Sequence, residues 1–268
     1  MHALLSNLRP IHIGLLTLFS LSLFANNRIF RVSADAHFLY LADALWSGSL
    51  SLTRSPPHKN DWASYEIVTL KGEGGKDGAR LRGFFPHGKG GRFRHLDGHE
   101  EQVPKRKIKR RETKYFVSFP PLPALLMLPL FLLFGYKSPD VLFTLLFAAL
   151  NGALIWSLLG RLSRRPGAER APPERLWITL LFTLGTAHAW CAVQGRVWYT
   201  ALVVGLSFHL LYLRFAIDMR RPFLAGCALA AAFATRASLI CAALFFYAQL
   251  IWPTDPQLSA RERWRRAL

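Results

Sequence analysis

The chain has 268 residues, of which 51% are hydrophobic, and its 34 Lys and Arg outnumber its 16 Asp and Glu to give a formal net charge of +18. Much of this charge falls in short loops between apolar runs, which is typical of an integral membrane protein and argues against a soluble domain. Nucleic acid is a poor partner for such charge, because anionic lipid headgroups lie nearer to it.

The first apolar run, from Ile11 to about Phe30, predicts a membrane-spanning helix, since about 20 residues cross the hydrocarbon core of a bilayer. Arg9 precedes this run, and short loops rich in Lys and Arg stay in the cytoplasm. We therefore place the N-terminus in the cytoplasm and the residues after this span at the outer membrane face. No convincing cleavage site follows, so we expect residues 1–33 to be retained as the first transmembrane helix rather than removed as a signal peptide.

A long polar loop follows the first span, and its first part predicts an amphipathic helix along the outer membrane surface. Phe38, Leu41, Ala42 and Leu45 recur there at helical spacing, so one face of the helix is apolar. We take residues 34–64 as this juxtamembrane helix and a linker.

Residues 65–114 predict a small antiparallel β module within the outer loop. Short segments rich in strand-forming residues alternate there with glycine-rich turns. The segments are Tyr65–Leu70, Arg80–Phe85, Arg92–Leu96 and Glu101–Val103, and the turns are Gly72–Gly75 and Gly88–Gly91. The basic run Lys105–Arg111 near the end of the module predicts either a solvated strand and linker or a surface for anionic lipid headgroups or a polyanionic acceptor.

An apolar segment with four prolines occupies residues 115–138, and its unbroken apolar part is too short for an easy crossing. If it crossed the membrane, the basic stretch Arg161–Arg175 would lie outside, against the positive-inside bias. We therefore expect a short interfacial helix at the outer face.

Residues 139–252 predict the second to sixth spans. Three of them are Pro139–Gly160, Leu176–Val193 and Val197–Ile217. Pro222–Trp252 is too short for two full spans, and both of its ends are basic. We expect two short helices that meet at Thr235-Arg236 near the outer face, and one long tilted helix with a buried Arg is the alternative. Residues 253–268 predict a basic cytoplasmic tail.

Asp35 is the first acidic residue after the first span, and its place at the outer face makes it a candidate base for chemistry on a lipid-linked substrate. The more ordinary role for such an Asp is to cap the helix that starts near Ala36. Arg196 and Arg236 lie in outer turns of the same topology. Each could bind a phosphate, or could extend its side chain to lipid headgroups.

Several segments resemble, in order, those of GT-C type membrane glycosyltransferases, which use polyprenyl-phosphate sugars and include protein mannosyltransferases and the aminoarabinose transferase of lipid A. Ser33–Gly48 is similar to the first outer loop of the class, and Phe116–Gly135 resembles its proline-rich second juxtamembrane helix. Leu158–Leu162 is similar to the aliphatic-to-basic end of the next span, and Ala225–Arg236 resembles a helix that ends in Thr and a basic residue. The resemblance runs over most of residues 10 to 252.

The resemblance implies that Asp35 serves an active site at the outer membrane face. Transfer of a sugar from a lipid phosphate to a hydroxyl needs a base for the hydroxyl proton and cations for the leaving phosphate. Asp35 is the candidate catalytic base, and Arg236 and Arg196 are the candidate phosphate contacts. His37 and Tyr40, close to Asp35 in sequence, are candidates to orient it or the acceptor.

No metal-ligand or nucleotide-binding pattern occurs in the sequence, so we expect no metal site, and dependence on a divalent metal is left open. The donor substrate implied by the resemblance is a polyprenyl-phosphate sugar. Members of the class are generally longer than this chain, so we expect it to be the N-terminal portion of such an enzyme.

The sequence therefore predicts a mainly α-helical, polytopic protein of the inner or cell membrane, with about six crossings, juxtamembrane helices and a small outer β module. Its expected partners are membrane lipids and a lipid-linked sugar, without nucleic acid. A non-catalytic membrane scaffold or subunit whose β module binds a partner is the alternative. A small transporter is a weaker one, because no charged residue recurs in paired, broken spans.

Overall fold

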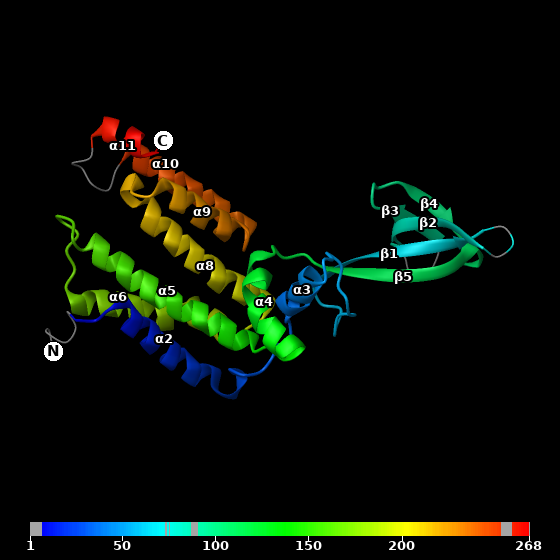
Figure 1. Cartoon of the computed structure of the whole chain (residues 1–268), viewed down its shortest axis with the longest axis horizontal. Coiled ribbons are helices and arrows are strands. Elements are labelled where there is room, and N and C mark those ends of the chain that lie inside the picture. Colours follow the sequence, from blue (N-terminus) through cyan, green and yellow to red (C-terminus); the bar gives the residue numbers. More distant parts are fainter. Residues whose placement is uncertain (1–6, 73, 75, 87–90, 253–258, 268) are drawn as a thin grey trace. The chain divides into compact units, whose positions relative to one another are not determined.

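The computed structural model describes residues 7–72, 74, 76–86, 91–252 and 259–267. The chain divides into two compact units. The first unit comprises Met1–Ala42 and Phe119–Leu268 and is helical, and the second, Asp43–Ser118, contains a five-stranded antiparallel sheet. The predicted combination of a mainly helical chain with one small β module is therefore confirmed (Figure 1).

The longer helices of the first unit lie side by side as a bundle (Figure 1). The helices are α2 (Pro10–Ala25), α3 (His37–Trp46), α4 (Leu122–Phe134), α5 (Asp140–Leu162), α6 (Pro172–Gly185), α7 (Ala187–Ala192), α8 (Val197–Ala216), α9 (Pro222–Phe233), α10 (Ala243–Ile251) and α11 (Ala260–Ala267), with 3₁₀ turns η1 (Asn26–Arg28), η4 (Gly135–Lys137), η5 (Ile217–Met219) and η6 (Ala237–Ala242). Leu21 of α2, Leu145 of α5 and Val203 of α8 meet in a buried apolar core. This core fixes α5 between α2 and α8.

Small residues allow α2 and α5 to approach each other closely. A Cβ atom at Gly14 would lie 3.3 Å from the carbonyl oxygen of Ala149, and one at Gly152 would lie 2.4 Å from Oγ1 of Thr17. Contacts through small residues are a common way to pack helices in a membrane, where burial from water does not drive helices together.

Replacing Gly152 with Ala is expected to lower the thermal stability of the protein in detergent, because the added methyl group has no space between Thr17 and Thr183. Overpacking of this kind costs about 1–3 kcal/mol. Gly226 of α9 is the matched control, since a Cβ there meets nothing within 4 Å, and Gly226→Ala should be neutral or slightly stabilising. Melting temperatures of the two variants test the packing, and equal shifts would contradict it.

The structure confirms the helical character of the predicted spans but not the number of crossings. In the residue ranges that the structure describes, two helical stretches are long and apolar enough to cross a membrane, Asp140–Leu162 and Val197–Met219, each of 23 residues. The first apolar run forms the 16 residues of α2, and a 3₁₀ turn begins at Asn26. The third predicted span is divided, because α6 ends at Gly185 and Thr186 starts α7 by accepting a hydrogen bond from the amide of His188 at 3.2 Å.

Residues 222–251 form a helical hairpin. The chain turns after α9 at Thr235 and Arg236, and η6 and α10 return beside α8. The hydroxyl of Tyr212 in α8 donates to the carbonyl oxygen of Ala242 at 2.8 Å, and the side chain of Gln249 accepts a hydrogen bond from the amide of Asp218 at 3.2 Å. The structure therefore has the two short helices expected around Thr235-Arg236, with both ends of the hairpin at one end of the bundle.

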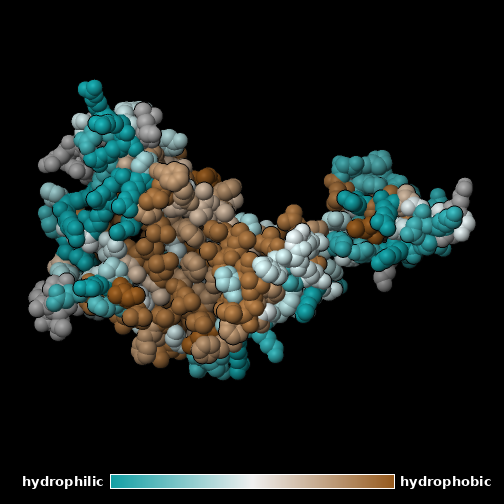
Figure 2. Space-filling view, viewed as in Figure 1, coloured by the Kyte–Doolittle hydropathy of each residue, from teal (hydrophilic) through white to brown (hydrophobic). Residues whose placement is uncertain are grey.

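The surface of the helical unit carries a broad apolar zone and a hydrophilic zone at one end (Figure 2). Large apolar side chains on several helices are more than half exposed, among them Phe19, Leu133, Trp177, Phe223 and Leu244. A water-soluble monomer seldom exposes apolar surface on this scale. The apolar zone therefore favours contact with lipid or with another apolar surface.

Basic segments from distant parts of the sequence meet at the hydrophilic end. The guanidinium group of Arg161, at the end of α5, donates to the carbonyl oxygen of Ile217 at 3.1 Å. Arg165 forms an ion pair with Asp218, and Arg175 stacks on the ring of Trp156 at 4.2 Å. The loops that the sequence analysis assigned to the cytoplasm thus lie together at one end of the bundle.

The second unit is an antiparallel sheet with the strand order β4-β3-β2-β1-β5. The strands are β1 (Trp62–Lys71), β2 (Asp77–Phe84), β3 (Gly91–His95), β4 (Glu100–Val103) and β5 (Ile108–Val117). Val68, Phe85, Phe93 and Val103 form its buried core, and the four predicted strand segments largely coincide with β1 to β4. The predicted glycine turns include residues 73, 75 and 87–90, which lie outside the described residues.

The basic run near the end of this unit forms a 3₁₀ turn, η3 (Lys105–Lys107), and the first half of β5. Nζ of Lys109 lies 2.8 Å from Oδ1 of Asp77, and Arg111 pairs with Glu66 on the neighbouring strand. The Lys109 ammonium group lowers the pKa of the Asp77 carboxyl group. The carboxylates of Glu66 on β1 and Asp77 on β2 thus offset part of the repulsion within the run, as expected for the solvated strand.

Candidate functional site

Asp35 lies at the N-terminal end of α8. Its backbone carbonyl oxygen accepts a hydrogen bond from the amide of Val197 at 3.0 Å, and its carboxylate Oδ2 lies 3.5 Å from Nε of Arg196. Asp35 is only 5% exposed, whereas the side chain of Arg196 is 46% exposed. The site therefore combines a buried carboxylate with a guanidinium group that reaches the surface.

A sharp turn between α7 and α8 creates this arrangement. Gly195 has φ +68°, a conformation that residues with a side chain rarely adopt. A Cβ atom there would also lie 2.6 Å from the side chain of Val141. The turn brings the start of α8 against Asp35, and the positive end of a helix dipole favours a carboxylate or a phosphate at this place.

Asp140 holds the segment that carries Asp35. Its Oδ1 accepts a hydrogen bond from the amide of Ser33 at 2.8 Å, and its Oδ2 accepts one from the Ser33 hydroxyl at 2.6 Å. Asp140 is 1% exposed and is the first residue of α5. Both carboxylate oxygens are engaged two residues before Asp35, so Asp140 is a positioning residue.

The sequence analysis missed Asp140, although one signal was available. It is an acidic residue at the head of an apolar run, directly after Pro139, and an acid there is costly to bury without a partner. The identity of the partner could not be read from the sequence, because Ser33 lies more than 100 residues away.

Threonine hydroxyl groups continue the hydrogen bonds of Asp140 into the helical bundle. Oγ1 of Thr200 donates to Oγ1 of Thr144 at 2.7 Å and also lies 3.0 Å from the carbonyl oxygen of Gly195. Thr144 in turn donates to the carbonyl oxygen of Asp140 at 2.8 Å. The starts of α5 and α8 are therefore joined by buried hydrogen bonds, which limits how far the Asp35 segment can shift.

His37 and Tyr40 lie on α3, next to Asp35 in sequence, but in aromatic surroundings. The ring of His37 is fully buried, with its centroid 5.9 Å from Phe119 and 6.2 Å from Trp198. The ring of Tyr40 packs edge-on against Tyr136 at 4.8 Å. The structure therefore gives both residues a packing role for α3, and their predicted contact with substrate stays a prediction.

Arg236 lies in a different part of the bundle from the residues around Asp35. It lines a cavity of about 340 Å³ whose walls are mostly apolar and whose polar members include His188 and His209. Asp35 is not among the residues that line this cavity. In the structure, therefore, the side chains of Asp35 and Arg196 lie next to each other. Arg236 instead lines a separate cavity whose walls are mostly apolar.

Among the described residues, no group of three or more His, Cys, Asp or Glu side chains is arranged to hold a metal ion. Comparisons with models of protein families, with curated proteins and with solved structures found no match for this chain.

Proposed function

We propose that the chain is the membrane-embedded part of a glycosyltransferase that moves a sugar from a polyprenyl-phosphate donor to an acceptor hydroxyl. The observation that carries the proposal is the buried carboxylate of Asp35 beside the half-exposed Arg196 at the start of α8. A base and a phosphate-binding cation are the two groups that this transfer needs. The resemblance of the surrounding segments to GT-C type enzymes supplies the reaction class.

In the proposed reaction, Asp35 takes the proton of the acceptor hydroxyl while the oxygen of that hydroxyl attacks the anomeric carbon of the donor sugar. The bond between that carbon and the phosphate oxygen breaks, and the bonding electrons leave with the polyprenyl phosphate. Arg196 and the amide groups at the start of α8 would stabilise the charge on the leaving phosphate. Ser33 and Asp140 keep the carboxylate in register with that end of α8.

The apolar surface and the basic end support a membrane setting for this reaction. Asp35 lies at the start of α8, and Arg214 lies in the last turn of the same helix, so the two are about 26 Å apart along its axis. This is roughly the thickness of the hydrocarbon core. We propose that the arginine-rich end is cytoplasmic and that Asp35 faces the outer side, with the hairpin of α9 and α10 entering and leaving on the cytoplasmic side.

Cysteine labelling tests this topology. In a background with Cys191, Cys227 and Cys241 replaced by Ser, a cysteine at Leu96 should react with a membrane-impermeant maleimide applied to intact cells. A cysteine at Glu169 should react only after the membrane is opened, because Glu169 lies in a loop proposed to be cytoplasmic. Leu96 and Glu169 are both exposed, so accessibility alone does not separate them. Labelling of Glu169 from outside would overturn the assignment of Asp35 to the outer face.

Arg236 was predicted from the sequence to contact the donor phosphate, and its role is tested separately because it lines a cavity that Asp35 does not line. A guanidinium group can bind phosphate through two hydrogen bonds and an ammonium group binds as a point charge. Donor affinity should therefore fall from the native protein to Arg236→Lys and again to Arg236→Gln, by about tenfold or more in total. Equilibrium binding of a polyprenyl-phosphate sugar to the three proteins in neutral detergent measures this affinity. Equal affinities for the three proteins would assign Arg236 to lipid headgroups instead.

The proposed function as a whole is tested by incubating purified chain in liposomes with radiolabelled polyprenyl-phosphate sugars and an alcohol acceptor. Transfer of label to the acceptor, dependent on Asp35, is the expected result. Saturable donor binding without transfer would support the donor site alone. Absence of both binding and transfer would favour the alternative of a non-catalytic scaffold whose β module binds a partner.

A further inference from the structure

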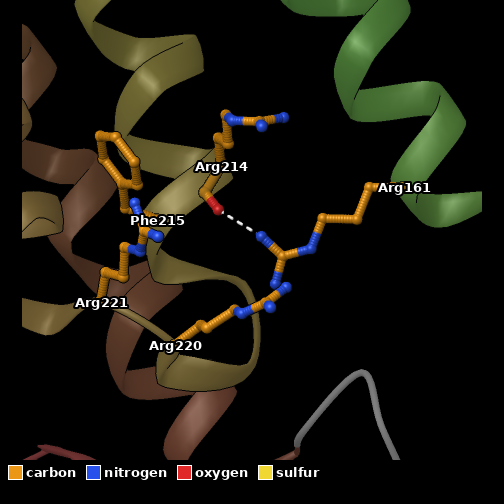
Figure 3. A pocket seen from close by; sticks show the side chains of 5 residues that line it. All are labelled: Arg161, Arg214, Phe215, Arg220 and Arg221. Atoms are coloured by element: carbon orange, nitrogen blue, oxygen red, sulfur yellow. Dashed lines mark hydrogen bonds between the residues drawn. The ribbon is translucent and has the colours of Figure 1, made fainter.

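A cluster of arginines encloses a pocket at the end of the bundle where α5 and α8 finish. The cavity has a volume of about 220 Å³ and is lined by Arg161, Arg214, Phe215, Arg220 and Arg221 (Figure 3). It adjoins a second cavity of about 390 Å³ that shares Arg161, Arg214 and Arg220. The proposed glycosyl transfer does not use these residues, since they lie at the opposite end of α8 from Asp35.

Contacts with the bundle fix two of these arginines. The guanidinium group of Arg161 donates to the carbonyl oxygens of Arg214 and Ile217, as Figure 3 shows for the first of these. Arg214 donates to the hydroxyl of Ser157. Arg161 and Arg214 therefore form a rigid wall of the pocket, positioned by α5 and α8.

The other two arginines keep their guanidinium groups available. Arg220 and Arg221 are exposed, and no hydrogen bond or ion pair within the described part of the chain occupies either side chain. Asp218 is the nearest acidic residue in the sequence, and its carboxylate is already engaged by Arg161 and Arg165. Arg161 and Arg220 repel each other, and none of the described residues that line the pocket is acidic.

We propose that this arginine pocket binds the phosphate group of an anionic ligand. Planar guanidinium groups match the oxygens of a phosphate in pairs, and they bind it more specifically than ammonium groups do. Phe215 supplies an apolar wall beside the charges, and Phe223, only two residues after Arg221, is 80% exposed at the start of α9. Phosphate chemistry next to exposed apolar surface fits a lipid headgroup, and free phosphate offers the same charged group.

Titrations of the purified full-length chain in neutral detergent distinguish these sources. One arm adds inorganic phosphate, with chloride at matched ionic strength as its control, and the other adds phosphatidylglycerol, with phosphatidylcholine as its control. The melting temperature should rise saturably with phosphatidylglycerol and not with phosphatidylcholine. A similar rise at equal concentrations of inorganic phosphate would assign the pocket to free phosphate, whereas a rise with the lipid alone would assign it to a headgroup.

The double variant Arg220→Gln/Arg221→Gln should bind the stabilising ligand at least tenfold more weakly, because it loses the two guanidinium groups that are available. Arg28→Gln/Arg31→Gln is the matched control, since it removes the same charge from exposed positions at the far end of α2, and it should bind within about twofold of the native protein. Arg220→Lys/Arg221→Lys should fall between the native protein and the Gln variant.

Two results would overturn the proposal. One is a native protein that neither inorganic phosphate nor phosphatidylglycerol stabilises. The other is an equal loss of binding in the pocket variant and in the control, which would mean that net charge alone attracts the ligand. Should the double Gln variant fail to fold, Arg221→Gln alone replaces it, and an affinity equal to that of the native protein would then count against the pocket.

Discussion

Asp35→Asn is expected to reduce the rate of glycosyl transfer about 10²–10⁴-fold, the usual contribution of a general base. Asparagine has nearly the same shape and keeps an oxygen that can face Arg196, but it cannot take a proton. The initial rate of sugar transfer in liposomes measures the effect. Donor affinity should change little, because Arg196 and the start of α8 would still bind the phosphate.

Asp43→Asn is the matched control for this experiment. Asp43 is the next acidic residue along the chain after Asp35, and its carboxylate accepts a hydrogen bond from Thr53. Its substitution makes the same chemical change in the second unit and should leave transfer within about twofold of the native rate. Transfer by Asp35→Asn at a rate near that of the native protein would remove Asp35 from the mechanism.

The second large effect is expected at Asp140. Asp140→Ala leaves the amide of Ser33 without its acceptor and leaves the Ser33 hydroxyl with only the carbonyl oxygen of Gly195 at 3.2 Å, and an unsatisfied donor of this kind costs about 1–3 kcal/mol. The melting temperature should fall, and the transfer rate should fall with it because the Asp35 segment is no longer held. Asp140→Asn is the informative partner, since its side-chain oxygen can accept from the Ser33 amide and its NH₂ group can donate to the Ser33 hydroxyl.

The order of these variants separates a positioning role from a purely structural one. Stability and transfer should both rank as native, Asp140→Asn, Asp140→Ala, and the pH dependence of transfer should stay unchanged because Asp35 remains the base. A stable Asp140→Ala protein with native transfer would contradict the anchor. A shift in the pH profile would instead place Asp140 among the groups that exchange protons.

Several parts of the site could be predicted from the sequence because charge determines topology locally. The basic loops placed Asp35 and the turn at Arg196 on the same side of the bundle, and the structure brings their side chains to 3.5 Å. The same counting of charges predicted the hairpin around Arg236. Each of these predictions needed only the sign of a charge and the length of an apolar run.

Other features depend on contacts that no local pattern records. The division of the third predicted span at Thr186 follows from a hydroxyl that starts a new helix turn, within a segment whose hydropathy is continuous. The bond between Ser33 and Asp140 joins residues from two distant segments. His37 was predicted to orient Asp35 or the acceptor, which stays a prediction, and nothing in the sequence indicated that its ring packs against Phe119 and Trp198.

The β sheet also has a feature that depends on contacts and not on a local sequence pattern. Four strands were predicted from segments rich in strand-forming residues between glycine-rich turns, whereas for the basic run that starts β5 a solvated strand and linker was only one of the alternatives. Pairing with β1, in which Glu66 lies opposite Thr113 and near Arg111, makes that strand favourable. Whether a charged segment of this kind forms a strand depends on the residues opposite it on the neighbouring strand. Those residues are known only once the strand register is known.

Asp218 joins distant segments of the chain at the arginine-rich end of the bundle. Its side chain accepts from Arg161 and Arg165, and its backbone carbonyl oxygen accepts from Arg266 of α11. Two segments distant from Asp218 in sequence thus depend on this residue, so substitutions among them should not have additive effects on stability. Once Asp218 is neutralised, the later loss of Arg165 should be almost silent. Natural sequence change at this end of the protein would therefore be expected to alter these positions together.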